Sequence, residues 1–347
     1  MKAIVLRNFG GPEVLHLEDA PTPEPVQSEI LIKVRSVSVN RTLDCTVRAG
    51  DYPVQIQMPH VLGVDPAGEV VEIGAGVEKF AIGDRVATIS IMPCLKCRQC
   101  LKGLEANCLA SKHIGLHRWG GYAEYVAVPE RNAFRIADNL SFADGTVITR
   151  HFPMAFNLLS SKTTIKPGEW VLVMGAAGAL GSCCVQVAKM SGAKVIPAAG
   201  ADDRVALAME YGADFGVNYR TQDLAAEVMK LTDNDGVDVV CENIADPMLW
   251  PGAFNSLAIG GRLVTAGAHG GGMVNLDVKR LYLRRQSILG AAGTNPPDVE
   301  RALDAARAGK IRAMNYRALP LGAAAEAHRI VERNQIAGKL ILDPTLE

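Results

Sequence analysis

The chain of 347 residues is long for one domain and comfortable for two. Its 48% hydrophobic and 21% charged residues are those of an ordinary globular protein that can bury a substantial core. A formal net charge of -1 gives no electrostatic reason to bind nucleic acid or a membrane surface, so we expect neither as a partner.

The location of the protein is suggested by its apolar runs and its cysteines. The first residues turn polar too soon for a secretory signal, and no apolar run approaches the ~20 residues that span a bilayer. Four of the eight cysteines fall within residues 94–108. Such crowding indicates metal binding in a reducing compartment rather than scattered disulfides. We therefore expect a cytoplasmic protein.

The first part of the chain, to about residue 145, is predicted to be rich in β-strands. Short apolar runs at residues 30–34 and 68–73 are separated by Gly, Pro and Asp. From about residue 169 the pattern changes, and buried-strand runs alternate with stretches of helical length. These runs are residues 170–174, 194–196, 237–241 and 262–266. Alternating strands and helices predict an α/β domain with a doubly wound parallel sheet.

The end of the chain returns to short elements. They are an apolar run at 287–290, a helical stretch at 299–308 and a final strand at 339–342. We therefore expect one domain, built from residues 1–146 and 286–347, into which a dinucleotide-binding domain of residues 147–285 is inserted.

Four cysteines at short separations form the first chemical motif. Cys94, Cys97 and Cys100 follow each other at intervals of three, and Cys108 comes after seven more residues. Four thiolates on one loop can surround one zinc ion tetrahedrally and leave no open position. We expect one structural zinc, the alternative being a reduced empty loop or adventitious disulfides.

A glycine-rich loop forms the second motif. Residues 175–181 follow the strand at 170–174 and precede a predicted helix at 182–189. Small residues let the backbone approach a pyrophosphate, and a helix N-terminus offers N–H donors and partial positive charge. A plain tight turn is the alternative. The predicted cofactor contacts are Ala176, Gly178, Ala179, Leu180 and Gly181.

The segment after the next strand favours NADPH over NADH. A site for NAD carries an acidic residue about 20 positions after the glycine loop, where this chain has Ala199 followed by Gly200. Arg204 could pair with a 2′-phosphate, although it could equally be solvated. The nearby Asp202 and Asp203 keep NADH as an alternative. Further predicted cofactor residues are Tyr219, Asn243 and Gly267, the last two of which follow later strands of the sheet.

These two motifs, in this order, resemble the medium-chain dehydrogenase/reductase superfamily over essentially the whole chain. The resemblance implies a GroES-like β-rich catalytic domain, a Rossmann domain, a cofactor cleft between them and a homodimer or dimer of dimers. The other stretches that match are residues 63–70, 83–86, 120–125 and 338–339.

The chain departs from the superfamily's zinc alcohol dehydrogenases where these hold a catalytic zinc. The first ligand position falls on Asn40, or on Arg41 in another alignment. The His-Glu pair reads Val64-Asp65, and the third position falls near Thr149. Asn40 and Val64 offer neither imidazole nor thiolate. The alternative is a rebuilt zinc site, for which the residues available are Cys45, His60 and His151.

Without a metal to polarise an alcohol, the remaining pattern resembles the quinone oxidoreductase and enoyl reductase branches. We expect an NADPH-dependent enzyme that transfers hydride to an activated C=C bond of an α,β-unsaturated carbonyl, enoyl thioester or quinone. A zinc-dependent alcohol dehydrogenase with an unconventional site is one alternative. A non-catalytic NADPH-binding protein is another.

Two residues are predicted to act on a small-molecule substrate. Asn40 replaces the lost ligand and is expected to donate a hydrogen bond to the substrate oxygen, unless it only caps the following helix. Tyr52 matches a segment in which some enoyl reductases carry a proton donor, but it could simply line the pocket. Arg150 and His151 lie near the third vacated position, and Trp119 and Tyr122 are expected to shape the substrate pocket.

Overall fold

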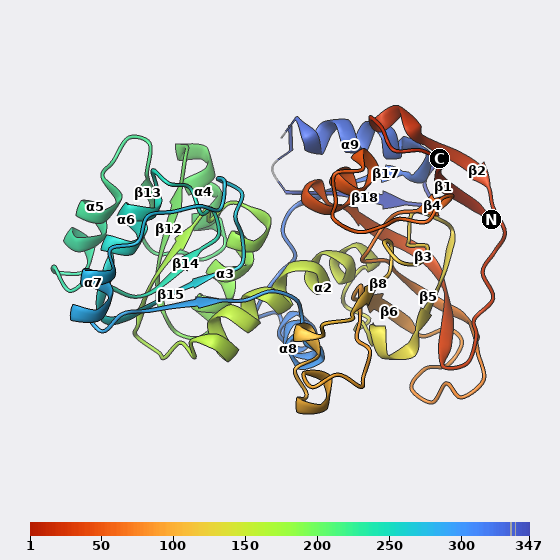
Figure 1. Cartoon of the computed structure of the whole chain (residues 1–347), viewed down its shortest axis with the longest axis horizontal. Coiled ribbons are helices and arrows are strands. Elements are labelled where there is room, and N and C mark those ends of the chain that lie inside the picture. The colour runs from red at the N-terminus through yellow and green to blue at the C-terminus, as the bar shows by residue number, and fades with distance from the viewer. Residues whose placement is uncertain (334, 337) are drawn as a thin grey trace. The chain divides into compact units, whose positions relative to one another are not determined.

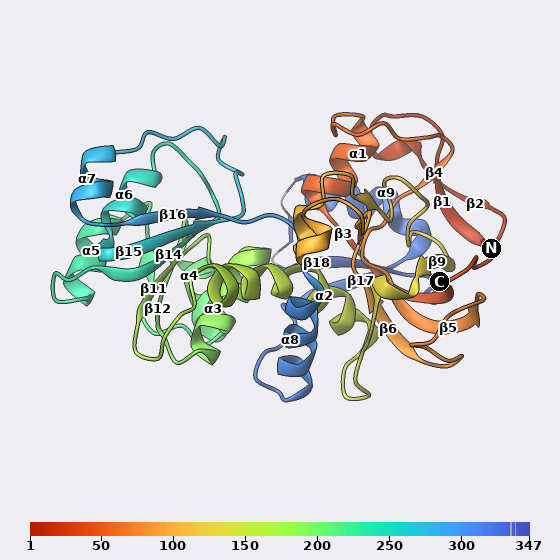
Figure 2. The same ribbon diagram turned by 60° about the horizontal axis from the view of Figure 1, so that its bottom comes forward.

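The computed structural model describes residues 1–333, 335–336 and 338–347. Its contacts divide the chain into two compact units. The first contains Met1–Arg150 and Thr294–Glu347, and the second contains His151–Gly293. Figures 1 and 2 show the second unit in green to blue and the first in red to yellow with a blue C-terminal part.

The first unit is built mainly from antiparallel strands. A three-stranded sheet has the order β2-β1-β4, and a seven-stranded sheet has the order β10-β6-β5-β3-β18-β17, with β9 also paired to β3. A small hairpin joins β7 to β8. The bounds of these strands are β1 (Lys2–Leu6), β2 (Leu15–Asp19), β3 (Glu29–Val39), β4 (His60–Val61), β5 (Ala67–Ile73), β6 (Arg85–Thr88), β7 (Ile91–Met92), β8 (Lys112–His113), β9 (Tyr125–Pro129), β10 (Ala133–Arg135), β17 (Tyr316–Pro320) and β18 (Lys339–Asp343).

The long strand β3 organises this unit. Nearly all of its residues are buried, because its first part pairs with β5 and β9 while its end pairs with β18. Leu340 pairs with Val39 in an antiparallel register, so that Lys339 comes to lie opposite Asn40. The helices that begin in this unit are α1 (Thr46–Ala49), α2 (Phe142–Phe156), α8 (Pro296–Arg307) and α9 (Ala324–Glu332), of which α2 continues into the second unit.

The second unit contains one parallel sheet of six strands. Its order, β13-β12-β11-β14-β15-β16, places the first strand in the middle. This is the doubly wound order of a Rossmann fold, in which right-handed crossovers put the early helices on one face and the later ones on the other. The elements are β11 (Trp170–Met174), α3 (Ala179–Met190), β12 (Lys194–Ala199), α4 (Asp202–Glu210), β13 (Val217–Asn218), α5 (Leu224–Leu231), β14 (Val237–Glu242), α6 (Trp250–Asn255), β15 (Leu257–Thr265), α7 (Val278–Leu283) and β16 (Ser287–Gly290).

The predicted fold class, a Rossmann sheet with a β-rich GroES-like domain, is confirmed. Both boundaries of the second unit lie later in the chain than the expected residues 147 and 285, since this unit spans His151–Gly293. The second boundary moves because β16 pairs in parallel with β15. The chain returns to the first unit only after this strand, at Thr294. Among the described residues, the structure contains no helix long and apolar enough to cross a membrane.

Candidate active site, cofactor loop and metal centre

A buried polar cluster lies where the resemblance places the vacated catalytic ligands. Asn40 follows β3, Asp44 lies in the helical turn at Arg41–Cys45, and Asp65 lies between β4 and β5. Lys339 begins β18, and all four side chains are buried. Arg150 of α2 reaches the same cluster. Five separate segments of the first unit thus meet at one point.

The amide of Asn40 joins the charged members of this cluster. Its Oδ1 accepts hydrogen bonds from Lys339 Nζ at 2.6 Å and from Arg150 Nε at 3.1 Å. Its Nδ2 lies 3.1 Å from Asp44 Oδ2, 3.3 Å from Asp65 Oδ2 and 3.2 Å from Ser38 Oγ. Both ends of the amide therefore have partners inside the protein. Asn40 is a bridge between two cations and two carboxylates.

The two carboxylates of the cluster are held differently. Asp65 accepts hydrogen bonds from the backbone N–H of Ser38 at 2.9 Å and from its hydroxyl at 2.5 Å. Asp44 accepts from the backbone N–H of Asn40 at 2.7 Å. Burial, followed by the negative charge of Asp65, raises the pKa of Asp44 to about 6. The cluster can therefore gain or lose one proton near neutral pH.

The other predicted residues of the first unit are placed differently from expectation. Tyr122 does not line a pocket: it is fully buried, and its hydroxyl lies 3.2 Å from His328 Nε2. It packs against Gly63, where a Cβ would lie 2.5 Å from the tyrosine ring. Trp119 donates its indole N–H to the carbonyl oxygen of Pro59. Tyr52 is partly buried in the loop after α1, and no hydrogen bond joins it to Asn40 in the described part of the chain.

The residues that could have rebuilt a zinc site have other partners. Cys45 Sγ lies 3.5 Å from His328 Nδ1, and His60 Nε2 lies 2.9 Å from the carbonyl oxygen of Gly115. Thr149 donates its hydroxyl to the carbonyl oxygen of Gly145. His151 directly follows Arg150 in α2, is partly buried and also has a partner within the protein.

The glycine loop has the compactness that a pyrophosphate requires. Gly178 precedes the first turn of α3 and has no side chain to occupy the N–H groups there. A Cβ on Gly181 would lie 2.2 Å from the carbonyl oxygen of Gly175, so only glycine lets α3 approach β11 this closely. Asn243 and Gly267 follow β14 and β15, whose carboxyl ends lie at the same edge of the parallel sheet as that of β11.

A basic patch follows the end of β12. A Cβ on Gly200 would meet the Tyr219 ring at 3.0 Å and Arg220 Nε at 3.3 Å. Burial raises the pKa of the Tyr219 hydroxyl, and the positive charges of Arg220 and Arg204 partly offset this increase. Asp202 is one of the two acids that keep NADH as an alternative, and it accepts a hydrogen bond from Asn218 Nδ2 at 2.7 Å. Tyr219 and Arg220 thus lie at Gly200, and the charge of Arg204 reaches the same tyrosine.

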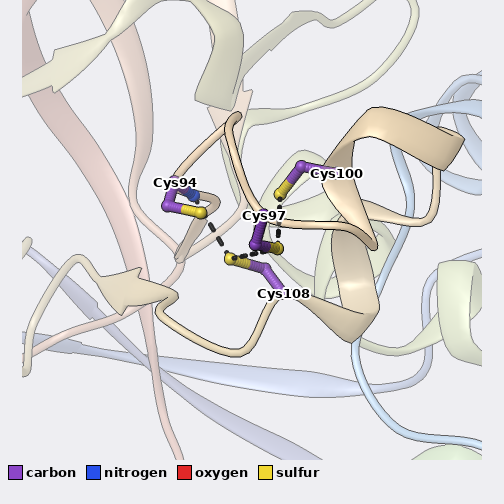
Figure 3. A group of neighbouring side chains, drawn as sticks. All are labelled: Cys94, Cys97, Cys100 and Cys108. Atoms are coloured by element: carbon purple, nitrogen blue, oxygen red, sulfur yellow. Dashed lines mark hydrogen bonds between the residues drawn. The ribbon is translucent and has the colours of Figure 1, made fainter.

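The four cysteines converge, as predicted. Figure 3 shows their sulfur atoms turned toward one another on the loop between β7 and β8. All four Sγ atoms lie within 4.8 Å of each other, and those of Cys97 and Cys108 are 3.9 Å apart. A tetrahedron of Zn–S bonds of about 2.3 Å has sulfur atoms about 3.8 Å apart. The donor set therefore fits a zinc ion.

Two residues of these sites were not selected from the sequence. Lys339 appeared there only as part of a matching dipeptide, and its contact with Asn40 depends on strand register. Arg220 directly follows the predicted Tyr219. Its basic side chain next to that tyrosine was the feature of the sequence from which it could have been selected.

Comparison with known proteins identifies the family. Residues 26–138 match the model of the alcohol dehydrogenase GroES-like domain, and residues 179–308 match that of the zinc-binding dehydrogenases. The chain belongs to the medium-chain dehydrogenase/reductase superfamily and is one of its oxidoreductases.

Its relatives include both alcohol dehydrogenases and quinone oxidoreductases. An NAD-dependent alcohol dehydrogenase of Sulfolobus acidocaldarius is 32% identical, with 99% of this chain and 100% of the relative covered. A quinone oxidoreductase of Sus scrofa is 29% identical, with 99% and 97% covered. The crystal structure of an NAD-dependent alcohol dehydrogenase superposes with a TM-score of 0.91 at 37% identity, covering 99% of each chain.

Proposed function

We propose that the protein is an NADPH-dependent reductase that transfers hydride to an activated C=C bond without a catalytic zinc. Its substrate is an α,β-unsaturated carbonyl compound, an enoyl thioester or a quinone. NADPH supplies the hydride when bound, and the carbonyl group conjugated to the double bond accepts the displaced electron pair. The four-cysteine loop holds one zinc ion with a structural role.

The observation that carries this proposal is the composition of the buried cluster. The positions that correspond to catalytic zinc ligands carry Asn40, Val64 and Thr149, and two cations, Arg150 and Lys339, bond to Asn40. The two carboxylates of the cluster, Asp44 and Asp65, accept hydrogen bonds within the protein, no thiolate or imidazole joins them among the described contacts, and the two cations would repel a zinc ion. Among the described residues, only the four cysteines bring three or more His, Cys, Asp or Glu ligand atoms together as a metal site would need.

The proposed preference for NADPH is supported by the patch around Gly200. Arg220 lies beside Tyr219 at Gly200, the charge of Arg204 also acts on that tyrosine, and Asp202 is already engaged with Asn218. Guanidinium groups bind phosphate through charge-assisted hydrogen bonds. NADH is the alternative, favoured by the relatives named NAD-dependent alcohol dehydrogenases.

One assay separates this proposal from its alternatives. The purified chain is given NADPH with a cyclic enone, a benzoquinone or a crotonyl thioester, and separately NADP⁺ or NAD⁺ with primary and secondary alcohols. Its zinc content is measured by elemental mass spectrometry. We expect NADPH oxidation with at least one electron-poor alkene, no alcohol oxidation and a single zinc per chain.

Other results would support the alternatives. Two zinc ions per chain with alcohol oxidation would indicate an unconventional alcohol dehydrogenase. Tight NADPH binding without turnover of any compound would indicate a binding protein. The cofactor is tested with Arg204→Gln, which should weaken NADPH binding about tenfold or more and leave NADH binding unchanged, since a charged hydrogen bond contributes about 1.5–3 kcal/mol. Lys230→Gln, an exposed site in the same unit, is the matched control.

A further inference from the structure

The guanidinium group of Arg150 is held at one edge and open at the other. Its inner edge is fixed, because Nε donates to Asn40 Oδ1 at 3.1 Å and lies 3.7 Å from Asp65 Oδ2. Its side chain is 28% exposed, and within the described residues the two terminal nitrogens make no hydrogen bond. Up to four N–H groups are therefore available to a partner outside the protein.

The surroundings of Arg150 keep it in place. Asn40 is itself held by Lys339 at its oxygen and by Asp44 at its nitrogen, so the acceptor of Arg150 cannot turn away. Burial lowers the pKa of the His113 imidazole, and the charges of His117 and Arg150 lower it further. The Arg150 guanidinium is held in place before a substrate arrives, and such a preorganised donor stabilises a developing negative charge without reorganisation.

The charge of the cluster leaves Arg150 able to bind an anion. Lys339 and Arg150 are balanced by Asp65 and Asp44 when both carboxylates are ionised. The oxygens of Asp65 face Ser38 and Asn40, and Asp44 faces the backbone of Asn40. No carboxylate is hydrogen-bonded to the terminal nitrogens of Arg150, as far as the structure is described. Its outer face is thus a free donor rather than half of a closed ion pair.

We propose that the Arg150 guanidinium binds the carbonyl oxygen of the substrate and stabilises the negative charge that forms there. This inference rests on the proposed function and assigns the oxygen-binding role, expected of Asn40, to Arg150. Asn40 then becomes a positioning residue, since its own hydrogens are used within the protein.

The β-carbon of the substrate accepts hydride from the reduced nicotinamide, forming a C–H bond with two electrons from the cofactor. The π-electron pair of the C=C bond moves to form the bond toward the carbonyl carbon, and the carbonyl π pair moves to oxygen, giving an enolate. Arg150 binds that oxygen and keeps its own proton, because a guanidinium group does not lose its proton in proteins. The α-carbon of the enolate then takes a proton from water, which forms the second C–H bond and gives the saturated carbonyl compound.

The test compares three variants of Arg150 with a matched control. In the full-length protein, Arg150→Gln should lower kcat for the activated alkene by about 10²–10³-fold, the effect of losing one oxyanion donor. Arg150→Lys should retain more activity than Arg150→Gln. Arg150→Ala should regain rate, saturably, when guanidinium ion is added. Arg7→Gln removes an exposed arginine elsewhere in the same unit and should keep full activity and show no response to guanidinium.

Asn40 is tested through its coupling to Arg150. Asn40→Ala should lower kcat in the wild-type background and have little further effect in the Arg150→Gln background, because both changes remove one function. NADPH affinity, measured by fluorescence, should stay unchanged in all Arg150 variants. An unchanged kcat in Arg150→Gln, or a lack of guanidinium rescue, would overturn the role of Arg150 while leaving the reductase proposal intact. A wild-type protein that reduces no activated alkene would instead overturn the proposed function, and this inference with it.

Discussion

Asp44 is a buried carboxyl of the cluster, and its surroundings disfavour its ionised form. It is 1% exposed, and burial and the nearby Asp65 both favour its neutral form. The backbone and side chain of Asn40 and the charge of Arg150 act in the opposite direction. The net result is a pKa of about 6 rather than the usual 3.8. Near neutral pH the folded protein therefore contains an ionised Asp44, although the fold is more stable when this carboxyl is protonated.

This shift predicts a pH dependence of stability. A carboxyl whose pKa is higher in the folded state stabilises the fold below its unfolded pKa and loses that contribution as pH rises through the folded pKa. The free energy of unfolding of the wild type should therefore fall, relative to Asp44→Asn, by about 2 kcal/mol between pH 4 and pH 6.5. Urea unfolding across this range measures the difference. The control Asp138→Asn, at a fully exposed site, should follow the wild type, and parallel curves for Asp44→Asn would contradict the prediction.

Single residues show how far sequence reasoning reaches here. Asn40 could be placed at the site from its position in the chain. Its role could not be predicted, because the amide is saturated by Lys339, which is brought there by the register of β18 on β3. Tyr122 was expected to shape the substrate pocket because it lies in a motif of the superfamily. Its burial could not be predicted, because it depends on contacts with Gly63 and His328, which are remote in sequence.

Elements with their own periodic pattern were predicted well. The apolar run at 170–174 became β11 with the same bounds, since strands of a parallel sheet are buried on both faces and read as continuous apolar stretches. The two-residue strands β7 and β8 have no such signal, although they flank the metal loop. The membership of β16 in the parallel sheet was also missed, because a short apolar run does not reveal its pairing partner.

The metal loop provides a prediction at this scale. Its segment from Cys94 to Cys108 contains only short 3₁₀ turns and several exposed leucines, so bound zinc is expected to supply much of its order. Cys100→Ser should reduce zinc from one ion per chain to none and lower the melting temperature, while kcat at low temperature remains close to wild type. Elemental analysis and calorimetry test this, with Lys102→Ala as a control in the same loop. Full zinc retention in Cys100→Ser would contradict a four-cysteine site.

At the scale of the whole molecule, β16 leaves one edge of a sheet unpaired. It pairs with β15 on one side, and no described strand lies on its other side. The preceding helix α7 exposes Val278, Tyr282 and Leu283. An open edge beside exposed apolar side chains favours association with a second copy.

We therefore expect light scattering after size exclusion to give a multiple of 37.0 kDa. The double substitution Tyr282→Glu with Leu283→Glu should shift the protein toward the monomer, because charge would be buried at the contact. Met248→Glu, at another exposed apolar site of the same unit, should leave the mass unchanged. A monomeric wild type, or a double variant of unchanged mass, would contradict this assembly.

The pairing of β18 with β3 also has a consequence for biosynthesis. The ribosome makes Asn40, Asp44 and Asp65 before the whole second unit, and Lys339 after it. Until then Arg150 would be the cation beside Asp65, and the amide of Asn40 would lack one of its donors. The nascent first unit thus stays incomplete until β18 has been made, while the Rossmann unit between its halves can already close.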